Sequence, residues 1–179
     1  KIASYNNDTL EDFAGMFRYS KLIEAVNDAD TSILSNITTV KMYKYFTPTL
    51  NSGLKYTLNY NNALYNPHSG HNSSMGGIIS SSGFKVNNDS SVNEHFLDDD
   101  GAGNLRLYYL SGTTRVYTDT SYGTVNYTTG EVVLTSAHIT SISNVDGATS
   151  TQVRVFAIPS SNDIVPVRNQ VLSIDTSNS

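Results

Sequence analysis

The 179-residue chain contains no cysteine and no tryptophan, and it has only four prolines. Without cysteine it can form neither disulfide bonds nor a thiolate metal site, so the sequence does not indicate an oxidising or a reducing compartment. It also lacks any run of about 18 consecutive apolar residues, the length that a membrane-spanning helix needs. We therefore expect no transmembrane segment and no membrane partner.

Charged side chains are scarce as well. Lysine and arginine number 11 against 16 aspartates and glutamates, which gives a formal net charge of -5. The basic residues are spread thinly along the chain, whereas binding to the phosphates of nucleic acids requires a basic patch. We therefore expect no nucleic-acid partner.

Small polar residues and tyrosines are abundant. Asn, Ser and Thr make up about a third of the chain, and there are 12 tyrosines. Hydrophobic residues account for 38% of the chain, which is below the usual range for globular domains. This composition resembles that of β-rich virion and surface proteins more than that of a cytosolic enzyme. A core this thin favours a protein that gains stability from its neighbours in an assembly.

Helical spacing of apolar residues occurs near the N-terminus. Leu22, Val26 and Ala29 recur at i, i+4 and i+7, which predicts an amphipathic helix over residues 20–28. A second, shorter helix is predicted over residues 9–17, where apolar side chains again share one face.

Alternating polar and apolar residues predict strands over most of the remaining chain. A glycine-containing turn at residues 51–53 predicts that the first two strands form a hairpin. Gly130 is placed to supply the positive φ of a turn in another hairpin. The predicted strands and hairpins lie at 36–46, 53–60, 84–86, 105–110, 114–118, 123–135, 137–142, 152–158 and 171–174.

These patterns predict an α+β fold that is mainly β, with antiparallel sheets and hairpins and one or two N-terminal amphipathic helices. We expect an N-terminal helical segment over residues 1–35, a β-rich domain over 36–175 and a terminal tail over 176–179. A long, weakly patterned loop is expected at 61–83. Loops of this length inside a compact domain are uncommon, and many of them are functional.

Motifs for catalysis or metal binding are weak. His68 and His71 lie three residues apart but have no defined third ligand. The run Asp98–Asp100 lacks the alternating oxygen ligands and the later glutamate of a calcium loop, so we interpret it as a solvated turn. The glycine pair that follows precedes a strand and lacks the third glycine of a dinucleotide-binding motif. We therefore predict that the protein is not an enzyme, with no catalytic residues, no cofactor and no metal site.

Tyrosines are concentrated in and beside the predicted strands. Most are expected to pack in the core or across strands, and others to form an exposed aromatic face for protein contacts. A carbohydrate-binding groove uses similar residues, so both interpretations stay open at this point. The candidate interface residues, which lie in or near the long loop and the strand at 105–110, are Tyr60, Tyr65, His68, His71, Tyr108 and Tyr109.

Several segments resemble one known family. The helix YSKLIEAV and the run over residues 28–40 that follows it are similar to the baseplate wedge proteins of T4-type contractile-tailed bacteriophages, specifically the wedge subunit of the inner baseplate ring in the baseplate J-like group. Thr31 stands where this motif is expected to have proline. The resemblance continues in order along the chain, through NNALYNPHSGHN, FLDDDGAGNLRLYYL, YGTVNYTTGEVVL and SNDIVPVRNQVLSID. Proteins of this family are much longer and this chain begins with Lys1, so we expect a C-terminal portion.

The resemblance implies a structural role in the tail baseplate of the virion. It also implies that the protein is located in the host cytoplasm during assembly. It implies that the chain forms a homodimer and that the full-length protein forms a higher-order ring. It also implies binding to other baseplate wedge proteins and a rearrangement when the tail sheath contracts. The alternative, from a different class, is a carbohydrate-binding β-domain of a phage or surface adhesin.

Overall fold

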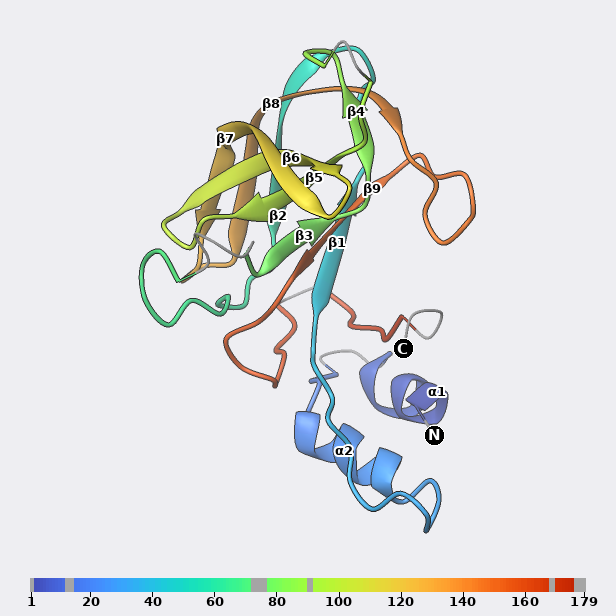
Figure 1. The fold of residues 1–179 in the computed structure, drawn as a ribbon. Helices are drawn as coiled ribbons and strands as arrows, with labels where there is room; N and C mark the ends of the chain where they lie inside the picture. The colour runs from blue at the N-terminus through green and yellow to red at the C-terminus, as the bar shows by residue number, and fades with distance from the viewer. Residues whose placement is uncertain (1, 12–14, 72–76, 90–91, 168–169, 176–179) are drawn as a thin grey trace. The chain divides into compact units, whose positions relative to one another are not determined.

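The computed structural model describes residues 2–11, 15–71, 77–89, 92–167 and 170–175 (Figure 1). The chain forms two compact units. The helical unit comprises residues 1–40 together with 161–179, and the β unit comprises residues 41–160. The chain therefore passes between the two units twice, once in each direction.

The helical unit contains α1 (Ile2–Tyr5), the π-helix η1 (Asn6–Leu10) and α2 (Tyr19–Asn27). The helix predicted over residues 20–28 is confirmed as α2. The helix predicted over residues 9–17 is wrong in position, because the helical turns lie at residues 2–10. Residues 12–14 of that prediction lie outside the described residues.

Residues from both ends of the chain hold the helical unit together. Phe17 and Ile164 exchange two backbone hydrogen bonds of 3.0 Å, and both side chains are buried. The side-chain oxygen of Asn6 accepts a 2.6 Å hydrogen bond from the backbone N–H of Ile174. Ile174 therefore bonds a helix rather than a neighbouring strand, and the strand predicted over residues 171–174 is wrong.

One antiparallel sheet of the β unit has the strand order β1-β9-β3. These strands are β1 (Met42–Phe46), β9 (Val153–Ala157) and β3 (Ile79–Ser81). β3 lies within the predicted loop at 61–83. The predicted hairpin between the first two strands is wrong, because β1 pairs with β9 and the next strand, β2 (Gly53–Asn59), belongs to the other sheet.

The other sheet has the order β2-β8-β4-β5-β6-β7, and β7 also pairs with β8. That last pairing closes five of its strands into a barrel, with β2 attached to β8. The strands not yet given bounds are β4 (Phe84–Val86), β5 (His95–Asp99), β6 (Asn104–Ser111), β7 (Thr114–Asn126) and β8 (Glu131–Ile142). The predicted fold class, α+β and mainly β with antiparallel sheets, is confirmed.

β7 and β8 are long strands where the sequence patterns predict shorter ones. Register shifts interrupt the pairing of each strand with its neighbours, and at these irregularities the alternation of inward-facing and outward-facing side chains changes. The hairpin predicted between them is confirmed, with Val125 opposite Val132 and a φ of 72° at Gly130.

Both sheets contribute to one hydrophobic core. Leu97, Val132 and Leu134 from the closed sheet and Val155 from the other are all completely buried. Burying one such side chain stabilises the fold by roughly 1.5–3 kcal/mol relative to leaving it exposed. This shared core fixes the surface loops of the β unit onto a rigid base.

The seam between β7 and β8 requires a residue without a side chain. Gly123 pairs with Leu134, and a Cβ atom at Gly123 would overlap the backbone carbonyl oxygen of Val133. Because backbone cannot rotate out of the way as a side chain can, only glycine allows the two strands to approach this closely.

We predict that Gly123→Ala lowers the free energy of unfolding by more than about 3 kcal/mol, because it forces the closing strands apart. Gly112→Ala is the matched control, since a Cβ there meets open space and pays only for the positive φ of 64°. That control should lose about 1–2 kcal/mol. Urea unfolding followed by circular dichroism measures both values. Equal losses in the two variants would contradict the close approach at the seam.

Candidate interaction surfaces

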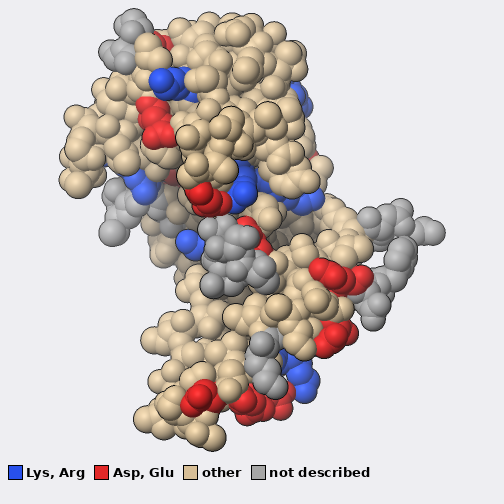
Figure 2. All heavy atoms as spheres, turned by 90° about the vertical axis from the view of Figure 1, so that its right-hand side faces the viewer, with Lys and Arg blue, Asp and Glu red and all other residues tan. Residues whose placement is uncertain are grey.

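Within the described residues, no three His, Asp or Glu side chains converge as metal ligands. No helix in the described part of the chain is long and apolar enough to span a membrane. Figure 2 shows one face of the molecule, where acidic and basic side chains are scattered among uncharged ones. Charge is therefore not gathered in one part of this face.

Three of the predicted interface residues lie together in the loop after β2. The rings of His68 and His71 are 4.7 Å apart, and Nδ1 of His71 lies 3.0 Å from Nε2 of His68. The Tyr65 ring packs edge-on against His71 with centroids 5.9 Å apart. Tyr65 is 44% exposed, and both histidines are exposed. We call Tyr65, His68 and His71 the Tyr65 cluster.

Backbone hydrogen bonds attach this loop to the β unit. The N–H of Tyr65 donates to the carbonyl of Ile158 at 3.0 Å. The side chain of Asn66 and the N–H of Gly70 both donate to the carbonyl of Gly101, each at 3.0 Å. The Tyr65 cluster is therefore presented by a loop segment that is hydrogen-bonded to residues just beyond the ends of β5 and β9.

The other three predicted interface residues lie elsewhere. Tyr60 is only 4% exposed, and its hydroxyl donates a 2.6 Å hydrogen bond to the carbonyl of Val155 in the core. Tyr108 is buried, and Tyr109 is half-buried with its ring packed against His95. The structure thus brings Tyr65, His68 and His71 together and places Tyr60, Tyr108 and Tyr109 apart from them.

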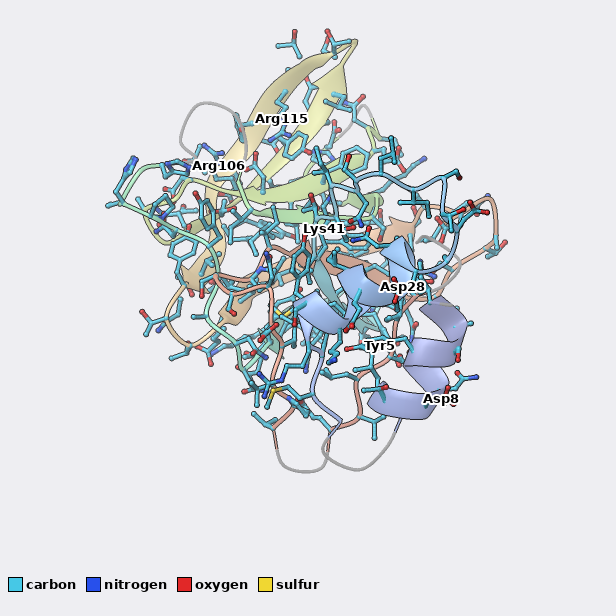
Figure 3. All side chains as sticks on the ribbon, turned by 90° about the horizontal axis from the view of Figure 1, so that it is seen from below. Tyr5, Asp8, Asp28, Lys41, Arg106 and Arg115 are labelled. Carbon is cyan, nitrogen blue, oxygen red and sulfur yellow. The ribbon has the colours of Figure 1, made fainter. Side chains whose placement is uncertain are left out.

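An ionic network that the sequence did not indicate surrounds the buried Asp98 on β5, β6 and β7. Asp98 Oδ1 accepts a 2.8 Å hydrogen bond from Nε of Arg106. Asp98 Oδ2 accepts one of 2.7 Å from Arg115 and one of 2.8 Å from the Tyr117 hydroxyl. Arg106 also donates to the backbone carbonyl of Asp99 at 2.8 Å. We call Asp98, Arg106, Arg115 and Tyr117 the Asp98 network; the two arginines are labelled in Figure 3.

Aromatic rings cover the arginines of this network. The Arg106 guanidinium lies 4.4 Å from the centre of the Tyr117 ring, and that of Arg115 lies 4.7 Å from the centre of the Tyr108 ring. Stacking of this kind suits the planar guanidinium. Burial raises the pKa of Tyr117 and the Asp98 carboxylate raises it further, so this hydroxyl remains a hydrogen-bond donor at neutral pH.

The interpretation of Asp98–Asp100 as a solvated turn is wrong for its first two residues. Both belong to β5 and are buried. Asp99 accepts hydrogen bonds from the N–H of Ile79 at 2.9 Å and from the Tyr127 hydroxyl at 2.7 Å. Only Asp100 lies in the turn, where it accepts from the N–H of Asn104 at 2.9 Å. The signal in the sequence was Arg106, placed among apolar residues of a strand where only a buried partner explains a charge.

We predict that Asp98→Asn lowers the free energy of unfolding by about 3 kcal/mol or more, because it leaves the buried Arg106 beside a neutral group. Asp146→Asn is the control, since Asp146 pairs with Arg154 at an exposed site. That change should cost under about 1 kcal/mol. Denaturant unfolding of both variants at neutral pH measures the difference. A loss in Asp98→Asn no larger than in the control would show that the network contributes no net stability.

Buried tyrosines predict a loss of stability at alkaline pH. Burial raises the pKa of Tyr60, Tyr122 and Tyr127 above the ordinary value of 10.0, and the bond to Asp99 raises that of Tyr127 further. The folded state therefore favours the neutral phenols. Their contribution is complete below pH 10 and is lost as the pH rises through the folded-state values.

The measurement is an absorbance titration of phenolate formation alongside the free energy of unfolding. Exposed tyrosines should ionise near pH 10, and these three should ionise only at higher pH, as the protein unfolds. Ionisation of all 12 tyrosines together near pH 10, in a protein that stays folded, would contradict the burial of these hydroxyls.

Comparison with known proteins identifies one family for part of the chain. Residues 1–45 match the family model of baseplate structural protein gp6, C-terminal domain III. No curated protein matches the chain. The matched residues include α2, the element that carries the YSKLIEAV motif. The resemblance to baseplate wedge proteins is confirmed over these residues, and the match supports a structural component of a phage tail baseplate.

Proposed function

We propose that the chain is a wedge component of a contractile phage tail baseplate that self-associates and also binds other baseplate proteins. The observation that carries this proposal is the match of residues 1–45 to a baseplate structural family. Assembly of the wedge takes place in the host cytoplasm, and the assembled protein remains in the virion. The chain acts through its surfaces and performs no catalysis.

The Tyr65 cluster is the contact surface that we assign to self-association. Tyrosine supplies a large, rigid and partly apolar contact area, and such residues dominate the energy of protein interfaces. The cluster is exposed, and hydrogen bonds of residues 64–70, including that of Leu64 to the carbonyl of Tyr127, hold its loop to segments next to the strands. A fixed loop loses little conformational freedom when a partner covers it.

A two-fold contact would place this cluster against the same cluster of a second copy. Polar Asn and Ser side chains are plentiful in the sequence of this loop, and they suit the rim of such an interface. A stable contact needs upwards of about 1,000 Å² of buried surface in total. The cluster would form the centre of that area.

The proposed rearrangement on sheath contraction agrees with the division of the chain into two units. Each unit has its own buried side chains, including Leu10 and Leu22 in the helical unit and Leu97 and Val132 in the β unit. Units with separate cores can change their relative position without unfolding. We propose that contraction acts on the two connections between the units.

We predict that the wild-type chain shows an average mass that rises with concentration in light scattering. Tyr65→Ser should weaken the association about tenfold, because it removes the central ring. Tyr45→Ser is the matched control, since Tyr45 is another exposed tyrosine, at 56%, and lies on β1. It should leave the association unchanged.

The same samples, applied to a glycan array, test the alternative function. A glycan signal that disappears in Tyr65→Ser would assign the cluster to carbohydrate binding instead. A wild-type chain that stays monomeric at every concentration would contradict self-association through this portion of the protein.

A further inference from the structure

A cavity of about 170 Å³ with polar and apolar walls lies in the β unit where β8 changes partners. β8 pairs with β7 through residues 131–134 and with β4 through residues 139–142. Ser136 and His138, which line the cavity, lie between these two pairings. The cavity is therefore a consequence of the topology of the closed sheet.

His95 contributes a buried nitrogen that has no hydrogen-bond partner among the described residues. The side chain is 0% exposed. Its Nδ1 lies 3.0 Å from the carbonyl oxygen of Asn93, and because a carbonyl can only accept, Nδ1 carries a proton. The other nitrogen, Nε2, is the unpartnered atom, and in the neutral ring it is a hydrogen-bond acceptor. Leaving such an acceptor unpaired is energetically unfavourable.

The charged residues of the cavity wall are all acidic. Asp89 and Asp119 line it, and no lysine or arginine of the described part of the chain does. Asp89 Oδ2 accepts a 3.0 Å hydrogen bond from the N–H of Asn93 and lies 3.9 Å from Nε2 of His95. Asp119 Oδ1 accepts a 2.8 Å hydrogen bond from the N–H of Ser121. A group that enters this cavity is therefore favoured when it is positively charged and donates hydrogen bonds.

The cavity also has an apolar wall. Val86 and Leu107 line it beside the polar residues, together with the ring of Tyr122. Its volume corresponds to about six water molecules. An aliphatic stem that displaces those waters from Val86 and Leu107 gains hydrophobic stabilisation while its charged end remains beside the carboxylates.

We propose that this cavity receives a lysine or arginine side chain of a neighbouring baseplate protein. This inference rests on the proposed function as an assembly component, and it adds the chemistry of the partner. The apolar wall takes the stem of the side chain, and its N–H groups donate to the Asp119 carboxylate and to Nε2 of His95. Charge complementarity favours this occupant, because an anionic group would face the carboxylates of Asp89 and Asp119.

The test titrates the full 179-residue chain with N-acetyl-lysine methylamide and observes the imidazole signals by NMR. The chain has four histidines, so the signals can be assigned by single substitutions. Those of His95 and His138 should shift with a dissociation constant in the millimolar range, as expected for one side chain alone. Those of His68 and His71 should not move. N-acetyl-norleucine methylamide, which has the stem without the charge, should leave all four unchanged.

Asp119→Asn should weaken binding of the lysine probe at least about tenfold by removing a charge from the wall. Asp146→Asn, a change at an exposed acidic residue, should leave binding unaltered. Unmoved His95 and His138 signals, an equal response to norleucine, or unchanged affinity in Asp119→Asn would each overturn the proposal. Putrescine binding more tightly than the lysine probe would assign the cavity to a free diamine and would also overturn it.

Light scattering of the wild-type chain separates this inference from the proposed function. A wild-type chain that self-associates but whose cavity binds no lysine probe defeats the cavity assignment alone. A strictly monomeric chain that still binds the probe defeats the self-association and leaves the cavity assignment in place.

Discussion

Neighbouring residues of a β-strand point to opposite faces, and β5 uses this geometry to bury two carboxylates back to back. Asp98 points toward the arginines of β6 and β7, and Asp99 points toward β3 and the turn that follows β5. Burying a carboxylate is costly unless partners surround it. The strands that supply those partners are thereby held in one register, since a shift of any of them by one residue would leave a charged side chain without its partner.

The two carboxylates also explain how a chain with so few apolar residues holds two sheets together. The Asp99 side chain binds the backbone of Ile79 on β3, which belongs to the three-stranded sheet, while its own strand belongs to the closed one. The Tyr60 hydroxyl makes a second polar link between the sheets, from the end of β2 to Val155 on β9. Directed hydrogen bonds thus supplement a thin core, and they fix the surfaces on which the Tyr65 cluster and the acidic cavity lie.

Local sequence patterns predicted the positions of most strands well, but they predicted poorly which strands pair with one another. The alternation of side chains located β2, β9 and the β7–β8 hairpin, because each signal lies within a few residues. The wrong hairpin between β1 and β2 arose because a turn at residues 51–53 is also compatible with two strands that enter different sheets. Within the candidate site, Tyr65, His68 and His71 are close in sequence and so lie close in space. The burial of Tyr60 and Tyr108, and the partners of Asp98, depend on distant strands that single-sequence patterns do not reveal.

The pairing of β1 with β9 sets the order in which the protein can fold during synthesis. More than a hundred residues separate the two strands, and the N–H and carbonyl groups of β1 have no ladder until the ribosome has released β9. The helical unit can be completed only later, because Phe17 pairs with Ile164, which is synthesised after β9. A nascent chain therefore carries β1 and Phe17 without their final partners while more than a hundred further residues are synthesised. This gives chaperones a long period in which to act and makes folding slow.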